Sequence, residues 1–145
     1  MSNLYDYLNW YNIELANDSG REIERNKGVY THTGIIIGRN RYSKEGMIFH
    51  NHPDTGPAIV TLAQFQNGND ARYTNRPSDD RDTVLIRSFR QVHSGASYSL
   101  PDYTCQDASS YARKGIAKSH GRSNTVGVLA FIGFLALLSG GGKGR

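Results

Sequence analysis

Cys105 is the single cysteine of this 145-residue chain, and its position suggests chemistry. It stands directly behind Thr104, a residue type that favours the N-cap of a helix. A thiol in the first helical turn lies at the positive end of the helix dipole, which lowers its pKa and favours the nucleophilic thiolate. The backbone N–H groups of that turn can also stabilise an oxyanion. A buried structural side chain is the alternative for a lone cysteine.

Two histidines on successive predicted strands supply the base that a cysteine nucleophile requires. His32 lies near the start of a β-rich segment, residues 29–38, and His50 ends the following strand. If these strands are adjacent and antiparallel, the two imidazoles meet at one rim of the sheet. We therefore predict Cys105 as nucleophile, His32 as base and His50 as the group that orients the base. His52 is the alternative third residue, because it shares the strand face of His50.

A metal site is the competing interpretation of these histidines. The His50-x-His52 spacing can bind zinc, but a catalytic zinc normally has three protein ligands, and His32, His50 and Asp54 are the set that could supply them. The single cysteine excludes a multi-cysteine zinc site and an intramolecular disulfide. We predict neither a metal nor a cofactor.

The rest of the pattern predicts an α+β domain around these residues. Apolar spacing of three and four favours an amphipathic helix over residues 3–16, and a second helix is expected from Thr104 to Ile116. Apolar and β-branched runs predict strands at residues 21–25, 29–38, 47–50, 58–62 and 83–92. Leu62–Phe65 is expected to form one helical turn. Residues 67–82 are polar throughout and predict a surface loop.

The C-terminal part differs in composition from the rest of the chain. The net charge of +4 comes from 17 basic and 13 acidic residues, and no acidic residue follows Arg113. The 20 residues between Arg122 and Lys143 carry no charge, enough for a helix of ~30 Å, about the thickness of a bilayer core. We predict a domain over residues 1–123 and a membrane-anchor segment over 124–145, with Thr125–Ser139 in the membrane. A buried core helix is the alternative for this segment.

Several classes of partner and location follow from the same composition. The N-terminus lacks a basic region followed by an apolar stretch, so we expect no signal peptide and place the domain on the cytoplasmic face of a membrane. Basic residues beside an apolar run favour an anionic membrane surface over nucleic acid, which we do not expect as a partner. The sequence leaves the oligomeric state open.

The order of these motifs resembles the lecithin:retinol acyltransferase-like family. Tyr30–Gly38 (YTHTGIIIG) resembles the family's Y-x-H-x-x-I-φ-φ-G strand, where φ is apolar, and Met47–His50 resembles the strand of the second histidine. Tyr98–Leu100 followed by Cys105 is similar to the approach to the N-C-E-H-F box, and Arg113-x-Gly115 is similar to the R-Y-G after it. The apolar tail resembles the anchor of the phospholipase/acyltransferase branch. The likeness spans roughly residues 20–140.

This resemblance implies a circularly permuted papain-like domain, with an antiparallel sheet packed against helices and a C-terminal hydrophobic helix. In the family the cysteine attacks an ester, the first histidine is the base and the second orients it, so an acyl-thioester forms and passes to water, an amine or a hydroxyl. Tyr30 corresponds to a family tyrosine near the site, and the resemblance implies that Tyr30 helps to hold the oxyanion. The chain departs from the box, which reads TCQDA over residues 104–108, and Thr33 replaces an aromatic residue.

Three functions remain open on this scaffold. The first is a membrane-associated thiol acyltransferase or phospholipase with a lipid or acyl substrate. The second is a peptidase or amidase of the NlpC type, because Gly56–Phe65 (GPAIVTLAQF) resembles the continuation found there. The third is a non-catalytic membrane- or protein-interaction module that retains the fold. Proteins with similar His and Cys boxes occur in some RNA viruses, where they work at host membranes.

Overall fold

A computed structural model describes residues 3–95 and 104–116 of the chain. Its sheet is built around β3 (Tyr30–Asn40), the longest strand. The predicted central strand is confirmed, since Ile35–Ile37 are buried and β3 has neighbours on both sides. A run that is apolar on both faces suits only a strand covered on both faces.

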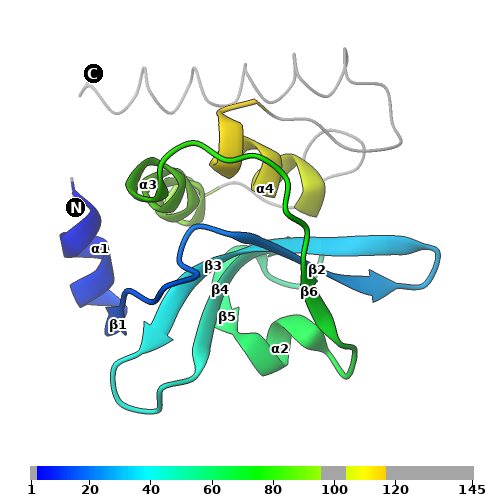
Figure 1. Ribbon diagram of the computed structural model, residues 1–145, viewed down its shortest axis with the longest axis horizontal. Coiled ribbons are helices and arrows are strands. Elements are labelled where there is room, and N and C mark those ends of the chain that lie inside the picture. The colour runs from blue at the N-terminus through cyan, green and yellow to red at the C-terminus, as the bar shows by residue number, and fades with distance from the viewer. Residues whose placement is uncertain (1–2, 96–103, 117–145) are drawn as a thin grey trace.

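All strand pairs of the sheet are antiparallel, and the other strands lie on either side of β3. Its order is β5-β4-β3-β2-β6, with β1 paired to the far end of β3. The strands flanking β3 are β2 (Glu22–Lys27) and β4 (Gly46–His52); the outer ones are β5 (Gly56–Thr61), β6 (Ala71–Tyr73) and the short β1 (Ile13–Glu14). The β2–β3 hairpin extends beyond the rest of the sheet in Figure 1.

Helices cover both faces of the sheet, which separates two apolar clusters. Figure 1 shows α3 (Arg81–Val92) and α4 (Cys105–Lys114) over one face and α2 (Leu62–Gln66) on the other, with α1 (Leu4–Trp10) beside α3. The larger cluster joins α1, α3 and α4 to Ile35, Ile37 and Phe49, while Phe65 of α2 packs on Ile36 and Ile48. The α+β class and the packing of an antiparallel sheet against helices are therefore confirmed.

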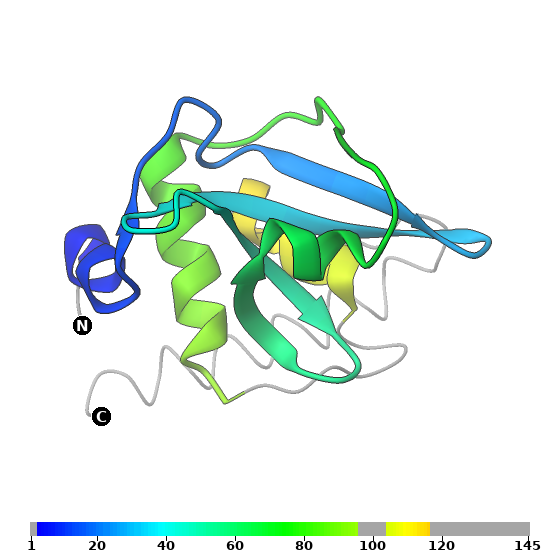
Figure 2. The ribbon, with the colours of Figure 1, turned by 90° about the horizontal axis from the view of Figure 1, so that it is seen from below.

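The prediction of a strand at Thr83–Val92 is wrong, because these residues belong to the helix α3. Its β-branched residues suggested a strand, but the buried positions Val84, Leu85, Ser88 and Phe89 repeat at helical spacing. Asp80 caps the helix by accepting a hydrogen bond from the Thr83 N–H at 3.1 Å. Figure 2 shows α3 running across the sheet rather than within it.

Two other predictions needed smaller corrections. The first helix ends at Trp10, not at residue 16, because Asn12 adopts a left-handed conformation with φ of 55° and the chain then enters β1. The predicted loop over residues 67–82 contains β6, which pairs with β2. The turn at Leu62–Phe65 and the helix beginning near Thr104 are confirmed. No described helix is long and apolar enough to cross a membrane, and residues 125–139 lie outside the described part of the chain.

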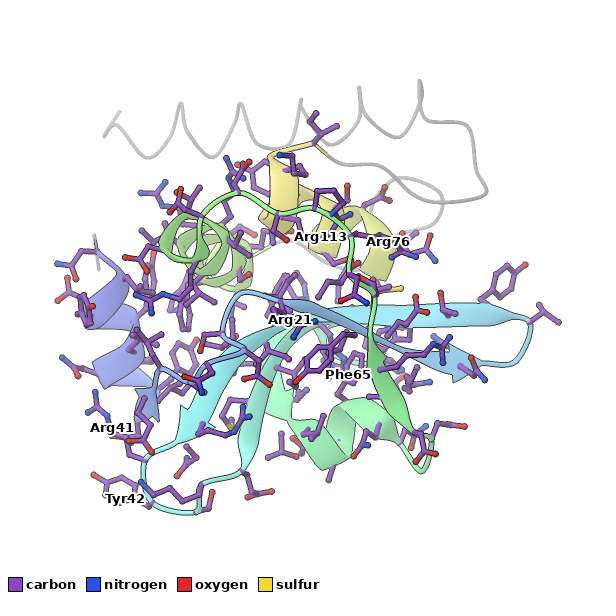
Figure 3. All side chains as sticks on the ribbon, in the orientation of Figure 1. Arg21, Arg41, Tyr42, Phe65, Arg76 and Arg113 are labelled. Atoms are coloured by element: carbon purple, nitrogen blue, oxygen red, sulfur yellow. The ribbon has the colours of Figure 1, made fainter. Side chains whose placement is uncertain are left out.

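A buried carboxylate ties the sheet to α4. The side chain of Glu22 is 1% exposed, accepts hydrogen bonds from Thr74 at 2.7 Å and Arg76 at 2.9 Å, and lies 3.3 Å from Arg113 of α4. Arg113 also donates to the Pro77 carbonyl at 2.7 Å, which holds the loop before α3. Figure 3 shows Arg76 and Arg113 close together beside α4. One carboxylate thus joins β2, this loop and α4.

Replacing Glu22 with Gln should lower the free energy of unfolding by about 3 kcal/mol, because the substitution leaves buried guanidinium charge without its anion. Urea denaturation monitored by circular dichroism measures this loss. Glu24→Gln is the comparison variant, since Glu24 lies on the same strand but is more exposed, pairing with Arg72 at 2.9 Å and with Arg76 at the longer distance of 3.4 Å. Its loss should be about 1 kcal/mol or less. Equal losses in the two variants would show that Glu22 has no special part in joining the elements.

Candidate active site

Cys105 is the first residue of α4, where the sequence predicted a helix to begin. Thr104 and Asp107 form a capping box: the Asp107 N–H donates to Thr104 Oγ1 at 3.3 Å, and the Thr104 N–H donates to Asp107 Oδ2 at 3.0 Å. The cysteine is 8% exposed. Its thiol therefore lies at a helix N-terminus that its neighbours fix firmly.

Thr33 of β3 anchors this end of α4 to the sheet. Its hydroxyl donates to the Cys105 carbonyl at 3.1 Å and shares a 2.7 Å hydrogen bond with Ser109, one turn further along α4. The sulfur of Cys105 lies 4.0 Å from the Thr31 carbonyl oxygen. β3 pairs with β4 only as far as Gly34, so the backbone around Thr31 and Thr33 contacts the cysteine where the ladder has ended.

His32 and His50 meet as their antiparallel strands predicted. His32 Nε2 and His50 Nδ1 are 2.9 Å apart, and both side chains are buried. The His32 ring also stacks on Phe65 of α2, with ring centroids 5.2 Å apart. A Cβ at Gly34 would meet the Phe65 ring at 2.8 Å, so glycine between the histidine and Ile36 leaves the space that the ring occupies.

The histidine pair and the cysteine lie on opposite faces of β3. Alternation along a strand sends neighbouring side chains to opposite faces, so Thr33 points to α4 while His32 points to α2 and Phe65. Within the described residues, no hydrogen bond joins the Cys105 sulfur to His32, and His32 Nδ1 and His50 Nε2 have no hydrogen-bond partner. The thiol and the imidazole thus approach the same stretch of strand backbone from its two sides.

Burial keeps all three groups in their neutral forms. It lowers the pKa of His32 to about 2 and that of His50 to about 4, and the positive charges of Arg25 and Lys27 act in the same direction. Burial also raises the pKa of the Cys105 thiol. Hydrogen bonds from Thr33 and the charge of Lys27 oppose that rise. The resting site therefore holds a thiol and two neutral imidazoles, not a thiolate–imidazolium pair.

The other predicted residues lie near this site without joining its hydrogen bonds. Tyr30 is 74% exposed near the tip of the β2–β3 hairpin, so its role at an oxyanion stays a prediction. The His52 ring is 5.5 Å from that of His32, but its Nδ1 accepts a hydrogen bond from the Asp54 N–H at 3.1 Å. No group of three or more His, Cys, Asp and Glu side chains in the described ranges is arranged to hold a metal ion.

Three residues that shape the site are not among those predicted from the sequence. Thr33 was noted only as a departure from an aromatic residue, yet its hydroxyl positions α4. Phe65 is predicted only as the end of a helical turn, yet its ring covers the histidines. Arg25 lies opposite His32 in the β2–β3 register, and its Nε donates to the Phe65 carbonyl at 2.6 Å. The one sequence signal that could have placed Arg25 beside His32 is the strand pattern of residues 22–27, if that strand is paired with β3.

The neutral histidines predict a loss of stability in mild acid. Both rings have a pKa below the ordinary value of 6.5 in the folded protein, so the unfolded chain binds protons first as the pH falls. Their contribution is complete above about pH 7 and should fall by about 4 kcal/mol in total by pH 5. Urea denaturation at the two pH values measures the change.

His50→Asn provides the control for this pH dependence, because it removes one of the two titrating rings. The difference in unfolding free energy between pH 7 and pH 5 should shrink by roughly half in the variant. NMR of the imidazole protons gives a direct reading in the wild-type protein. Rings of His32 and His50 that titrate near pH 6.5 in the folded state would contradict the buried, neutral pair.

Comparison with known proteins identifies no family for this chain. No protein-family model matches the chain, and no curated protein matches it. The likeness to the lecithin:retinol acyltransferase-like proteins therefore rests on the motifs around His32, His50 and Cys105 and remains a resemblance.

Proposed function

We propose that this protein is a cysteine-dependent acyltransferase or hydrolase in which Cys105 forms an acyl-thioester, His32 is the base and His50 orients the base. The observation that carries the proposal is the pair of His32 on β3 and His50 on β4, 2.9 Å apart, beside the part of β3 that holds the N-terminus of the cysteine-bearing helix. A nucleophile, a base and an orienting group are the residue types of covalent acyl transfer, although the thiol and the imidazole are on opposite faces of β3 in this geometry.

The tautomer of the histidine pair decides which nitrogen can act. If His32 Nε2–H donates to His50 Nδ1, the buried His32 Nδ1 keeps a free lone pair, and that nitrogen has no partner within the described residues. His50 then holds His32 in the form that can accept a proton. The His52 ring makes no hydrogen bond to His32 among these residues, which favours His50 as the third residue.

The reaction follows from these atoms. His32 Nδ1 takes the thiol proton as the Cys105 sulfur bonds to the acyl carbonyl carbon, and the carbonyl electrons move to its oxygen. Collapse of this adduct breaks the bond to the leaving group, which receives the proton from His32 and departs. Water, an amine or a hydroxyl then attacks the thioester with His32 again as base, which releases the acyl product and restores the thiol.

The resting geometry requires one movement before this reaction can begin. The thiol and His32 Nδ1 lie on opposite faces of β3, so the sulfur must pass the Thr31–Thr33 backbone to reach the base. β4 does not pair with this part of β3, so no ladder hydrogen bond between β3 and β4 blocks the passage there. Contacts between catalytic groups are often long in unliganded enzymes and shorten when substrate binds.

The remaining features of the proposal extend beyond the described site. A circularly permuted papain-like arrangement accounts for the chain order His32, His50, Cys105 on strands followed by a helix. The uncharged segment 125–139 would anchor the protein to a membrane, with the domain on its cytoplasmic face and lipid or another acyl donor as substrate. The basic residues that flank this segment suit an anionic lipid surface.

A non-catalytic interaction module is the second candidate, and one observation favours it. The raised pKa of the Cys105 thiol and the lowered pKa of His32 both oppose proton transfer between them in the resting state. A protein that uses the fold only as a binding surface needs no such transfer. The two candidates differ in whether a covalent acyl-enzyme forms.

Intact-mass spectrometry after incubation with a p-nitrophenyl acyl ester tests the proposal. The wild-type protein should gain the mass of one acyl group, and Cys105→Ala should gain none because the nucleophile is absent. His32→Asn should slow acylation about 100-fold or more, the usual effect of losing a general base. Phosphatidylcholine vesicles and a peptide amide are tested separately as substrates. Turnover of the vesicles favours the lipid hypothesis, and turnover of the amide favours the peptidase hypothesis.

His52→Asn is the matched control, because it removes a neighbouring imidazole that makes no hydrogen bond to His32. We expect acylation within about threefold of wild type in this variant, against a loss of about tenfold or more in His50→Asn. Equal acyl labelling of the wild type and Cys105→Ala, or no labelling of either, would reject the acyl-enzyme and leave the interaction module.

A further inference from the structure

The β2–β3 hairpin ends in an apolar tip that no described part of the chain covers. Its two-residue turn, Gly28-Val29, follows the last pair of the ladder, Lys27 and Tyr30. Val29 is 92% exposed and Tyr30 is 74% exposed, and a Cβ at Gly28 would meet no described atom within 4 Å. Figure 1 shows the hairpin extending away from the rest of the sheet. Among the described residues the tip therefore has no apolar partner.

The turn does not need valine for its geometry. A two-residue hairpin turn with glycine at its first position uses the positive φ of that glycine, and Gly28 has a φ of 60°. Turns favour Gly, Asn, Asp and Ser, whereas Val29 is apolar and β-branched. Exposure to water does not stabilise such a side chain, and transfer into an apolar phase does. A partner with an apolar interior would account for valine at this position.

The charges around the tip select the sign of that partner. No acidic residue occurs over residues 25–44. Lys27 and Tyr30 are cross-strand partners and point to the same face of the hairpin, and Lys27 makes no ion pair within the described residues. Glu24, the next acid along β2, is bonded to two arginines, and Asp54 belongs to the β4–β5 turn, where it lies 3.7 Å from an imidazole. The tip therefore suits a negatively charged surface.

We propose that the tip formed by residues 27–30 is a contact site for an anionic lipid surface. Val29 and Tyr30 enter the boundary between headgroups and acyl chains, and the Lys27 ammonium stays with the lipid phosphates. Aliphatic, aromatic and basic side chains on one protrusion combine apolar burial with attraction to anionic headgroups. The contact goes beyond the proposed chemistry and needs no reaction at Cys105.

The opposite end of β3 shows that exposure alone does not define this site. Tyr42, in the turn after β3, is 79% exposed, and Figure 3 shows it far from the β2–β3 hairpin. The nearby Lys44 is paired with Glu14 at 2.7 Å, and Glu45 follows it in the chain. This turn combines an exposed tyrosine with balanced charges, whereas the tip combines one with an unpaired positive charge. Tyr42 is therefore a matched control for Tyr30.

The tip and the candidate active site lie on the same strand. The Thr31 carbonyl oxygen, one residue after Tyr30, is 4.0 Å from the Cys105 sulfur, and His32 comes next. Docking of the tip would place the lipid surface beside the cysteine and the histidines. The contact is separate from the membrane anchor predicted at residues 125–139.

Quenching of tryptophan fluorescence by brominated phospholipids tests the contact. Val29→Trp combined with Trp10→Phe leaves one tryptophan, at the tip. Its emission should be quenched on vesicles of equal parts phosphatidylserine and brominated phosphatidylcholine. The wild-type protein has its single tryptophan on α1, which leads into the strand paired with the other end of β3, and that emission should stay unquenched. The comparison holds whether or not the C-terminal segment also binds the vesicles.

Further substitutions in the Val29→Trp, Trp10→Phe protein separate the parts of the contact. Tyr30→Ser should lower the ratio of docked to undocked tips about tenfold, because a large side chain no longer enters the boundary. Lys27→Gln should lower this ratio about fivefold on the anionic vesicles and leave it unchanged on pure phosphatidylcholine. Tyr42→Ser should leave the ratio unchanged on both.

Three results would overturn the inference: no binding to the anionic vesicles, an unquenched tip in vesicle-bound protein, or equal effects of Tyr30→Ser and Tyr42→Ser. An unquenched tip whose emission shifts to the blue as the protein concentration rises would assign the tip to a second copy of the chain instead. Quenching of the tip in a protein that forms no acyl-enzyme, with the same extent in Cys105→Ala, would uphold the lipid contact and reject the proposed function alone.

Discussion

The docking of α4 on β3 is the interaction on which the rest of the structure depends. The Thr33 hydroxyl forms hydrogen bonds with the Cys105 carbonyl and with Ser109. These two bonds fix both the start and the direction of α4. Glu22 holds the other end of α4 through Arg113. Because both contacts come from strands that are themselves neighbours, the sheet cannot shift its register without moving the cysteine.

This docking has an electrostatic consequence. It closes the sheet on one side with α4, while α2 and Phe65 close it on the other, so the polar residues near Gly34 are removed from water. Removal from water favours neutral forms, which explains why the histidines and the thiol are uncharged together. Arg25 is the exception, since a guanidinium keeps its proton even when buried. The site therefore contains one fixed charge among groups that can exchange a proton.

Local patterns in the sequence predicted what depends on local physics. The N-cap at Thr104, the central strand around Ile35–Ile37 and the meeting of His32 with His50 all follow from short-range rules of capping, burial and antiparallel pairing. The helix at Arg81–Val92 was misjudged because its β-branched residues favour a strand, whereas packing against the sheet imposes the helical spacing. The hydrogen bonds of Thr33 to α4 and of Arg25 to α2 could not be predicted, because each joins two elements that are distant in the sequence.

The alternation of side chains along β3 also separates what a sequence motif joins. His32 and Thr33 are adjacent in the chain, yet one contacts the histidine cluster and the other contacts the cysteine helix. The sequence motif suggests that His32 and Cys105 are partners, but they lie on opposite faces of β3. A meeting of the two groups would have to occur beside Thr31–Thr33, on the edge of β3 that β4 leaves beyond Gly34, because the other edge of β3 stays paired with β2 there. The end of the β3–β4 ladder, and not the motif alone, thus decides whether the proposed cysteine–histidine reaction can take place.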